Sequence, residues 1–300
     1  MNTKIFIAYS LAVILWGSAF PGIRVALESY TPFHLSLLRM VIATLALLIF
    51  AITVKMRIPE KKDIPIILLL GFLGFSIYHT FLNIGERTVD AGTASLLVST
   101  TPLLSALLAA FFLKEKFNRF GWIGSFIAFM GVALISIESG GNFSFSIEWG
   151  ALMILLGALG ESFYFVFQSS YLKKYGFLPF TTYTIIAGTL CMVPFSRGLW
   201  TSIQQASVES TVTAVYLGLL PTVIPYFAIA YATAKQGSSE ATSSLYLTPA
   251  VAILISWLWL GEVPAILSII GGILAIIGVS LTMLPSTAKR KHNFQQSKVL

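Results

Sequence analysis

Ionisable side chains are scarce in this sequence, so those that fall inside apolar runs are the first candidates for chemistry. Glu161 lies in the run GALGESFYFVFQSS, and Tyr164 and Gln168 follow it at helical spacing on one face. A carboxylate in apolar surroundings is costly unless it has a partner. Two interpretations of Glu161 stay open: it contacts a substrate amine or exchanges a coupling proton, or it is a hydrogen-bonded packing residue.

A second polar stripe follows helical spacing in the segment from 64 to 84 and just beyond it. Ser76, His79, Asn83 and Glu86 are separated by steps of three and four residues, and Tyr78 adds an amphipathic ring. We expect this stripe to face the interior of the protein. His79 can titrate near neutral pH, which makes it a second candidate for proton exchange. A hydrogen-bonded interior histidine is the alternative.

Further candidates are small polar or aromatic residues placed away from the ends of the apolar runs. They are Trp16, Ser18, Ser95, Ser99, Tyr226, Thr242 and Tyr246. Aromatic residues also serve as ordinary packing or as belts at membrane interfaces. We predict that these seven residues, together with Tyr78, His79, Asn83, Glu161, Tyr164 and Gln168, line a cavity that binds a small molecule.

Prolines interrupt several of the same runs. They are Pro21, Pro102, Pro221, Pro225 and Pro249. A proline inside a helix removes one backbone hydrogen bond and bends the chain, and the freed carbonyl then needs protein or water as a partner. We predict that these prolines are hinges or fixed kinks around the cavity.

The elements that position these residues are membrane helices. Charged residues form 10% of the 300-residue chain and hydrophobic residues 56%, whereas soluble domains are about 25% charged. A membrane-spanning helix needs about 20 apolar residues. We predict an all-α polytopic membrane protein with ten transmembrane helices, at residues 4–26, 33–54, 64–84, 91–113, 119–137, 148–170, 180–199, 211–233, 240–260 and 264–284.

One apolar sequence pattern occurs twice in the chain. Residues 95–116 read SLLVSTTPLLSALLAAFFLKEK, and residues 242–263 read TSSLYLTPAVAILISWLWLGEV. A single offset of 147 residues relates Pro102 to Pro249 and Glu115 to Glu262. Each glutamate follows one apolar helix and precedes the next, where a carboxylate favours the helix N-terminus. We therefore expect both glutamates to cap helices or form ion pairs.

Each half of the chain holds five predicted spans, and five is an odd number. The second half must therefore enter the membrane from the opposite face, which makes the two halves inverted repeats. The repeats are predicted at residues 5–137 and 148–284, followed by a cytoplasmic tail at 285–300. Inverted repeats are typical of secondary transporters, in which substrate binds between the halves and access alternates between the two sides.

The net charge of +7 follows the predicted topology. Of the 19 lysines and arginines, all but Arg24, Arg39, Arg87 and Arg197 fall on the side that holds the N-terminus. The positive-inside rule then places both termini in the cytoplasm and gives no reason to predict a nucleic-acid partner. Arg39 has two interpretations: an interfacial arginine that snorkels to the membrane surface, or a clamp for a substrate carboxylate.

Three stretches of the sequence carry a family resemblance. They are LAVILWGSAFPGIRVALESYTPFHLSLLRMVIA, ASLLVSTTPLLSALLAAFFLKEKFNRFGWIGSFIAFMGVALIS and SSLYLTPAVAILISWLWLGEVPAILSIIGGILAIIGVSLT. The chain resembles two EamA-type repeats of the drug/metabolite transporter superfamily. This resemblance implies a multi-pass transporter of the bacterial inner (cytoplasmic) membrane, often an exporter of amino acids or related metabolites, without an ATPase domain.

Rival functions lack their motifs. The two aspartates, Asp63 and Asp90, fall at the ends of predicted spans, and there is no His-Glu-x-x-His, Gly-x-Ser-x-Gly or P-loop motif. We therefore predict no enzyme activity, no metal and no cofactor. The leading prediction is a secondary transporter of amino acids or related compounds, with the proton as candidate coupling ion; export as its direction is implied by the family resemblance alone. Transport of drugs, sugars or cationic and aromatic compounds is the alternative, and a membrane enzyme is a remote one. Both a monomer and a homodimer fit the sequence.

Overall fold

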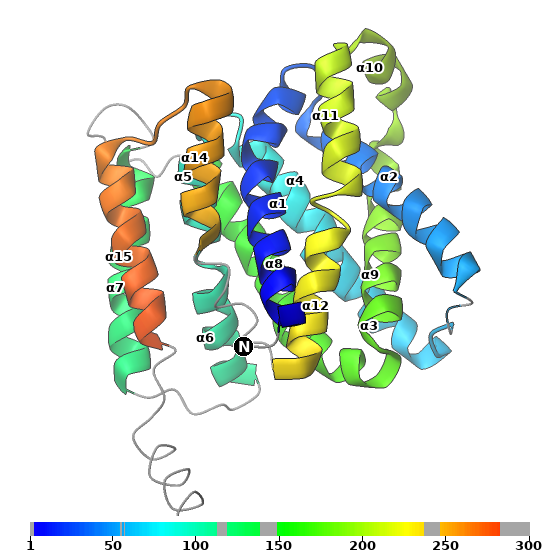
Figure 1. Cartoon of the computed structure of the whole chain (residues 1–300), viewed down its shortest axis with the longest axis horizontal. Coiled ribbons are helices and arrows are strands. Elements are labelled where there is room, and N and C mark those ends of the chain that lie inside the picture. Colours follow the sequence, from blue (N-terminus) through cyan, green and yellow to red (C-terminus); the bar gives the residue numbers. More distant parts are fainter. Residues whose placement is uncertain are drawn as a thin grey trace, which may run out of the picture.

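The computed structural model describes residues 3–54, 56, 58–112, 119–138, 149–236 and 247–282, which fold into helices without a strand (Figure 1). The first half contains α1 (Thr3–Leu27), α2 (Pro32–Thr53), η1 (Lys61–Asp63), α3 (Ile64–Gly71), η2 (Phe72–Ile77), α4 (Tyr78–Gly85), α5 (Ala91–Val98), α6 (Thr101–Phe112) and α7 (Arg119–Glu138). The second half contains α8 (Trp149–Tyr175), α9 (Phe177–Met192), η3 (Val193–Ser196), α10 (Leu199–Gln205), α11 (Val208–Leu219), α12 (Ile224–Gln236), α14 (Thr248–Leu260) and α15 (Ile266–Thr282).

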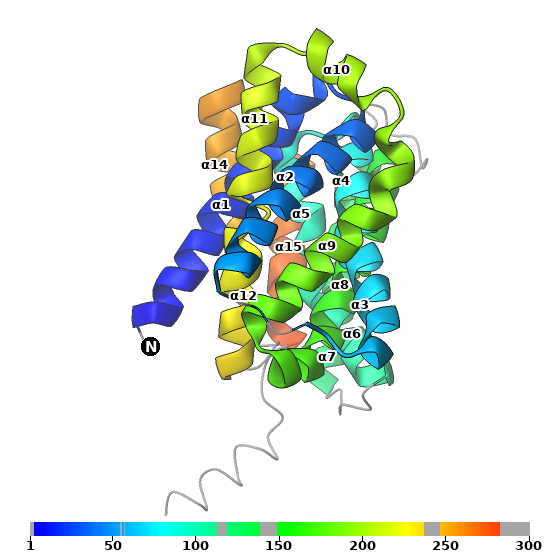
Figure 2. The ribbon, with the colours of Figure 1, turned by 90° about the vertical axis from the view of Figure 1, so that its right-hand side faces the viewer.

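The membrane-spanning segments agree with the prediction. Seven helical stretches of the described chain are long and apolar enough to cross a membrane, and three shorter apolar helices lie at Phe120–Leu134, Thr248–Leu260 and Ile266–Gly278. These ten segments match the ten predicted spans in order. The all-α polytopic membrane fold is therefore confirmed. The first turns of α1 extend away from the other helices (Figure 2), with the Phe6 side chain 56% exposed, as suits a lipid-facing surface.

Three of the spans are broken partway. The fourth divides into α5 and α6 around Ser99 and Thr100, and the eighth divides into α11 and α12 around Pro221. The third contains the π-helical segment η2, which falls at the residues equivalent to Pro221 by the 147-residue offset. Backbone freed from regular helical bonding is tolerated at membrane depth only where protein or a cavity surrounds it. These breaks therefore mark the interior of the bundle.

Most of these prolines lie near the start of a helix segment, and not in the middle of one bent helix as a simple kink would require. Pro102 and Pro249 lie in the first turns of α6 and α14, where the missing N–H would have no helical partner in any case. Pro225 is the second residue of α12. Pro21 alone among the five lies well inside a helix, and α1 continues through it. The prolines thus mainly begin new helix segments, and their role as hinges remains a prediction.

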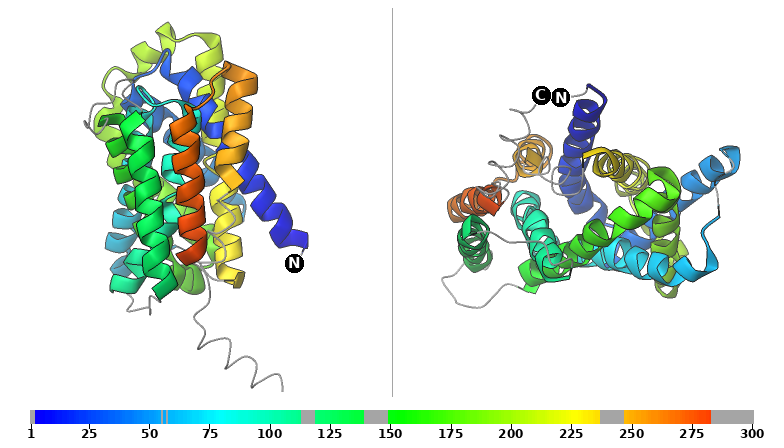
Figure 3. Two further views of the ribbon diagram at one scale, coloured as in Figure 1. Left: turned by 90° about the vertical axis from the view of Figure 1, so that its left-hand side faces the viewer. Right: turned by 90° about the horizontal axis from the view of Figure 1, so that it is seen from below.

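Close packing between α7 and α15 is reciprocal. A Cβ atom added to Gly131 would lie 2.4 Å from the carbonyl oxygen of Gly271, and one added to Gly278 would lie 2.4 Å from the backbone nitrogen of Ala128. The two helices therefore run antiparallel with their backbones in contact, side by side in Figure 3. Small residues permit such an approach in membranes. The 147-residue offset relates Gly131 to Gly278.

Glu262 has the structural role predicted for it. Its Oε1 pairs with Arg24 Nη2 at 3.0 Å, and its Oε2 accepts the backbone N–H of Ala91 at 3.2 Å, at the start of α5. Arg24 also donates to the carbonyl oxygen of Glu86 at 2.6 Å. This contact joins the end of α1 to the ends of α4, α5 and α14. Glu115 lies outside the described residues.

Candidate cavity between the repeats

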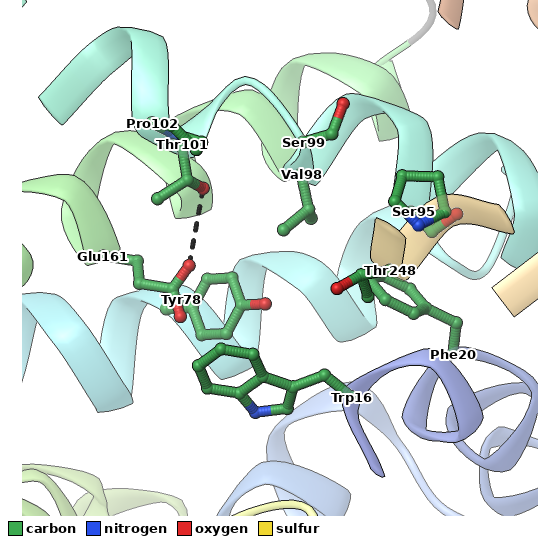
Figure 4. Close-up of a pocket in the computed structure, with 11 residues that line it drawn as sticks. Trp16, Phe20, Tyr78, Ser95, Val98, Ser99, Thr101, Pro102, Glu161 and Thr248 are labelled. Atoms are coloured by element: carbon green, nitrogen blue, oxygen red, sulfur yellow. Dashed lines mark hydrogen bonds between the residues drawn. The ribbon is translucent and has the colours of Figure 1, made fainter. Parts of the chain in front are cut away.

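A small cavity lies where both halves of the chain meet (Figure 4). Its volume is about 30 Å³, which is room for one or two water molecules. It is lined by Trp16 and Phe20 of α1, Tyr78 of α4, Ser95, Val98, Ser99, Thr101 and Pro102 of the broken fourth span, Glu161 of α8, and Thr248 and Pro249 of α14. Binding of a larger molecule would require the walls to separate.

Glu161 is the carboxylate of this cavity. Its side chain is 4% exposed. The Tyr226 hydroxyl donates to Oε1 at 3.0 Å, and the Thr101 hydroxyl donates to Oε2 at 3.4 Å. The position of Glu161 depends on close packing of α8, because a Cβ atom on Gly160 would lie 2.8 Å from the carbonyl oxygen of Leu73. The neighbouring glycine thus lets α8 pack closely against the third span.

The break between α5 and α6 shapes the wall opposite α8. Within it, the hydroxyls of Ser95, Ser99 and Thr100 donate to carbonyl oxygens three residues earlier, at 2.6, 2.6 and 2.7 Å. Such local bonds let the chain leave regular helix geometry without burying bare carbonyl groups. Pro102 has no N–H to give to the Val98 carbonyl, and both residues line the cavity. The break therefore places hydroxyl-bearing side chains of the fourth span in this wall.

Two Thr-Pro dipeptides face the same space, one from each half. Thr101-Pro102 and Thr248-Pro249 both line the cavity and are related by the 147-residue offset. The Thr248 hydroxyl is buried and has no hydrogen-bond partner among the described residues. Sequence reasoning singled out the prolines and missed both threonines, along with Phe20 and Val98. Extending the repeat alignment by one residue from each proline would have found the threonines.

Five of the thirteen predicted cavity residues lie in the wall: Trp16, Tyr78, Ser95, Ser99 and Glu161. Tyr226 lies directly behind it and contacts Glu161. Ser18 does not line the cavity; its hydroxyl lies 2.5 Å from the Tyr216 hydroxyl and donates to Leu15 O at 2.9 Å. Thr242 and Tyr246 lie outside the described residues. What the five wall residues bind stays a prediction.

The other predicted residues are buried away from this wall. Tyr164 and Gln168 are both 1% exposed, and Gln168 makes no hydrogen bond with any described residue through its side chain. His79 is 1% exposed, and neither of its ring nitrogens has a partner there. Asn83 donates to Ser36 Oγ at 2.8 Å. The stripe of the third span is thus buried in the interior as predicted, but it does not line the cavity.

Comparison with known proteins identifies the family of this chain. The model of the EamA-like transporter family matches residues 3–137 and 148–284, which are nearly all of the chain. This chain belongs to the EamA-like transporter family. The match covers two consecutive repeats, so the resemblance read from the sequence is confirmed.

Curated relatives of this EamA protein are transporters. An uncharacterized transporter, YdfC of Bacillus subtilis, is 56% identical over 94% of this chain and 92% of its own length. A probable terminal-alkyne amino-acid exporter of Streptantibioticus cattleyicolor is 39% identical over 95% of each chain. One crystal structure shares the fold with a TM-score of 0.64 and 19% identity, covering 95% of this chain and 98% of its own. The prediction that this chain is a transporter and not an enzyme is therefore confirmed.

Arg39 corrects a prediction in this EamA protein. The guanidinium is 2% exposed, and its Nε donates to Thr222 Oγ1 at 2.6 Å. The snorkelling interpretation is wrong, because this arginine is buried inside the bundle and does not reach the membrane surface. It does not line the cavity, so the described wall contains no cation. Among the described residues, no cluster of three or more His, Cys, Asp or Glu could hold a metal.

Proposed function

We propose that this EamA protein is a secondary transporter that moves small metabolites, with amino acids as the leading class and export as the direction. The observation that carries this proposal is a buried carboxylate, Glu161, in the wall of a cavity to which both halves contribute. Buried ionisable groups within membrane spans typically belong to substrate or ion pathways. The exporter among the relatives supports the substrate class and the direction.

Alternating access of two inverted repeats is the mechanism we propose. The halves would be residues 5–137 and 148–284. The reciprocal, antiparallel packing of Gly131 and Gly278 supports a two-fold relation between them. The present cavity is too small for a metabolite, so a substrate-binding state needs the wall formed by α5, α6 and α14 to move relative to α8. The positive-inside rule favours cytoplasmic termini and, with the family, the bacterial inner membrane.

Glu161 would serve as the group that binds substrate or proton in turn. It has no cation beside it in the described wall, so a substrate ammonium or a proton would supply the missing positive charge. His79 is a second candidate for the proton because it lies near the same site: the centroids of the His79 and Tyr226 rings are 6.3 Å apart. A carrier of cationic or aromatic compounds is a second function, favoured by the Trp16, Phe20 and Tyr78 side chains of the wall.

Counterflow in proteoliposomes tests the proposed function. Vesicles loaded with one unlabelled amino acid at a time should take up the same labelled amino acid, for a limited set of amino acids. Glu161→Gln should abolish accumulation driven by a pH gradient, while any exchange it retains should lose its pH dependence. Glu209→Gln is the matched control, because Glu209 is an exposed carboxylate at the start of α11. Absence of exchange for every amino acid, in folded protein, would refute the amino-acid proposal.

A further inference from the structure

The hydrogen-bonding groups around the cavity are mostly acceptors. A hydroxyl has a single hydrogen, and those of Ser95 and Ser99 are already donated to the carbonyl oxygens of Gly92 and Leu96. Toward the cavity these two side chains therefore offer only lone pairs. Glu161 is an acceptor through both carboxylate oxygens, and each oxygen retains capacity beyond the one bond it accepts from protein.

Other donors of the wall are also committed. The Trp16 indole N–H donates to the carbonyl oxygen of Pro221 at 3.1 Å. The Thr101 hydroxyl donates to Glu161. Each of these features leaves the wall richer in acceptors than in donors.

Two neutral donors remain. The Thr248 hydroxyl is buried without a hydrogen-bond partner among the described residues, and the Tyr78 side chain, which is 8% exposed, lines the same cavity. In Figure 4 both hydroxyls point toward the middle of the cavity, while the Glu161 carboxylate lies to one side of them. No lysine or arginine joins them in the described lining. Arg39 lies outside that lining; its Nε donates to Thr222, and its Nη1 has no hydrogen-bond partner among the described residues.

We propose that this cavity selects its ligands by an ammonium group and not by a carboxylate. An ammonium brings three donors and a positive charge to a wall of acceptors that contains Glu161. A carboxylate would find two neutral hydroxyls and no cation, so it contributes little affinity. The substrate class is then primary amines with a small apolar body beside Phe20 and Val98. Amino acids are one subset of this class, and the inference rests on the proposed transport function.

Ligand-induced thermal stabilisation of the purified full-length protein tests the inference without relying on transport. Two matched series serve as probes: L-leucine, isoamylamine and 4-methylpentanoate, and L-phenylalanine, phenethylamine and 3-phenylpropionate. The members of each series keep the apolar body and differ in whether they carry the amine, the carboxylate or both. A ligand that binds the folded state raises its unfolding temperature. We expect the amino acid and the amine of at least one series to stabilise, and neither carboxylic acid to do so.

Two variants separate the two ends of the ligand. Glu161→Gln should weaken binding of the amine and of the amino acid alike, by tenfold or more, since a charge-assisted bond is lost. Thr248→Val should weaken the amino acid much less than Glu161→Gln does and leave the amine unchanged, because only the carboxylate uses that hydroxyl and it contributes little affinity. Cooperative unfolding of each variant without ligand shows that it is folded.

Three results would overturn the inference. The first is a carboxylic acid that stabilises the protein as much as its amino acid does. The second is an amino acid that binds while its amine does not. The third is no stabilisation by any of the six compounds in protein that unfolds cooperatively. None of these results decides whether the protein is a transporter, because counterflow with a wider panel of solutes measures that separately.

Discussion

Substitution of Gly278 by alanine should separate two helices that now touch. The added Cβ atom would lie 2.4 Å from the backbone nitrogen of Ala128 and 2.5 Å from the carbonyl oxygen of Gly124. Favourable contacts of carbon with heavy atoms lie near 3.5 Å or beyond, so α7 and α15 must move apart by about 1 Å. Backbone atoms cannot rotate away as a side chain would. The cost of such overpacking is about 1–3 kcal/mol.

Thermal unfolding of the purified protein measures this cost. A loss of about 1–3 kcal/mol corresponds to a lowering of Tm by roughly 2–5 °C in a chain of this size. Gly131→Ala should have a similar effect, because its Cβ would meet the Gly271 carbonyl oxygen at 2.4 Å. The double variant should lose less than the sum of the two single losses, since the first substitution already opens the same interface.

Gly22→Ala is the matched control. It lies inside α1, and its Cβ would come 3.2 Å from Cδ2 of Leu217, a side-chain end that can shift. Alanine also favours the helix by about 1 kcal/mol over glycine, so Tm should stay near that of the wild type. Equal losses from Gly22→Ala and Gly278→Ala, or no loss from the latter, would show that backbone contact between α7 and α15 is not what excludes a side chain.

Two further predictions concern the charged contacts at the ends of the bundle. Glu262→Ala should speed amide hydrogen exchange at the start of α5, because it removes the acceptor of the Ala91 N–H. Glu262→Gln keeps an acceptor and should speed the exchange less. Equal exchange rates in the two variants would contradict the capping role. Hydrogen bonds from Lys62 and Lys174 hold the pKa of Glu60 below its usual value, so their stabilisation is present above about pH 5 and is lost as pH falls through the lowered pKa. The Tm difference between the wild type and Lys174→Met should therefore shrink in acid; a constant difference across pH would refute this.

The spans could be predicted from the sequence because hydrocarbon thickness imposes a length on every apolar run. The breaks at Pro221 and near Pro102 were also readable, since proline leaves a visible mark. The π-helical segment η2 carries no proline and so has no such mark; its equivalence to the Pro221 region was the only indication. The short helix α10 was not predicted, because it lies between spans, where hydropathy imposes no length.

The ionisable side chain of Glu161 marked it as a candidate in the sequence, but helical periodicity did not identify the residues that surround it in the cavity. Gln168 shares the Glu161 face of α8, yet it lies seven residues further on, about 10 Å along the helix axis. A helix that is buried on most sides gives no hydrophobic pattern to show which depth meets the cavity. Thr101 and Thr248 were missed for a different reason. Threonines are common in membrane helices, and only the joint position of these two beside the prolines distinguishes them.

The repeat supports the proposal that Glu161 has a functional role. A residue needed to build the shared fold should have a counterpart 147 residues away. The counterpart of Glu161 is Ile14, which is 53% exposed, and the counterpart of its partner Tyr226 is His79. The Thr-Pro dipeptides, in contrast, occur in both halves and line the same cavity. Features that shape the cavity are thus duplicated, while the carboxylate is present once, as expected of a group selected for the ligand rather than for the fold.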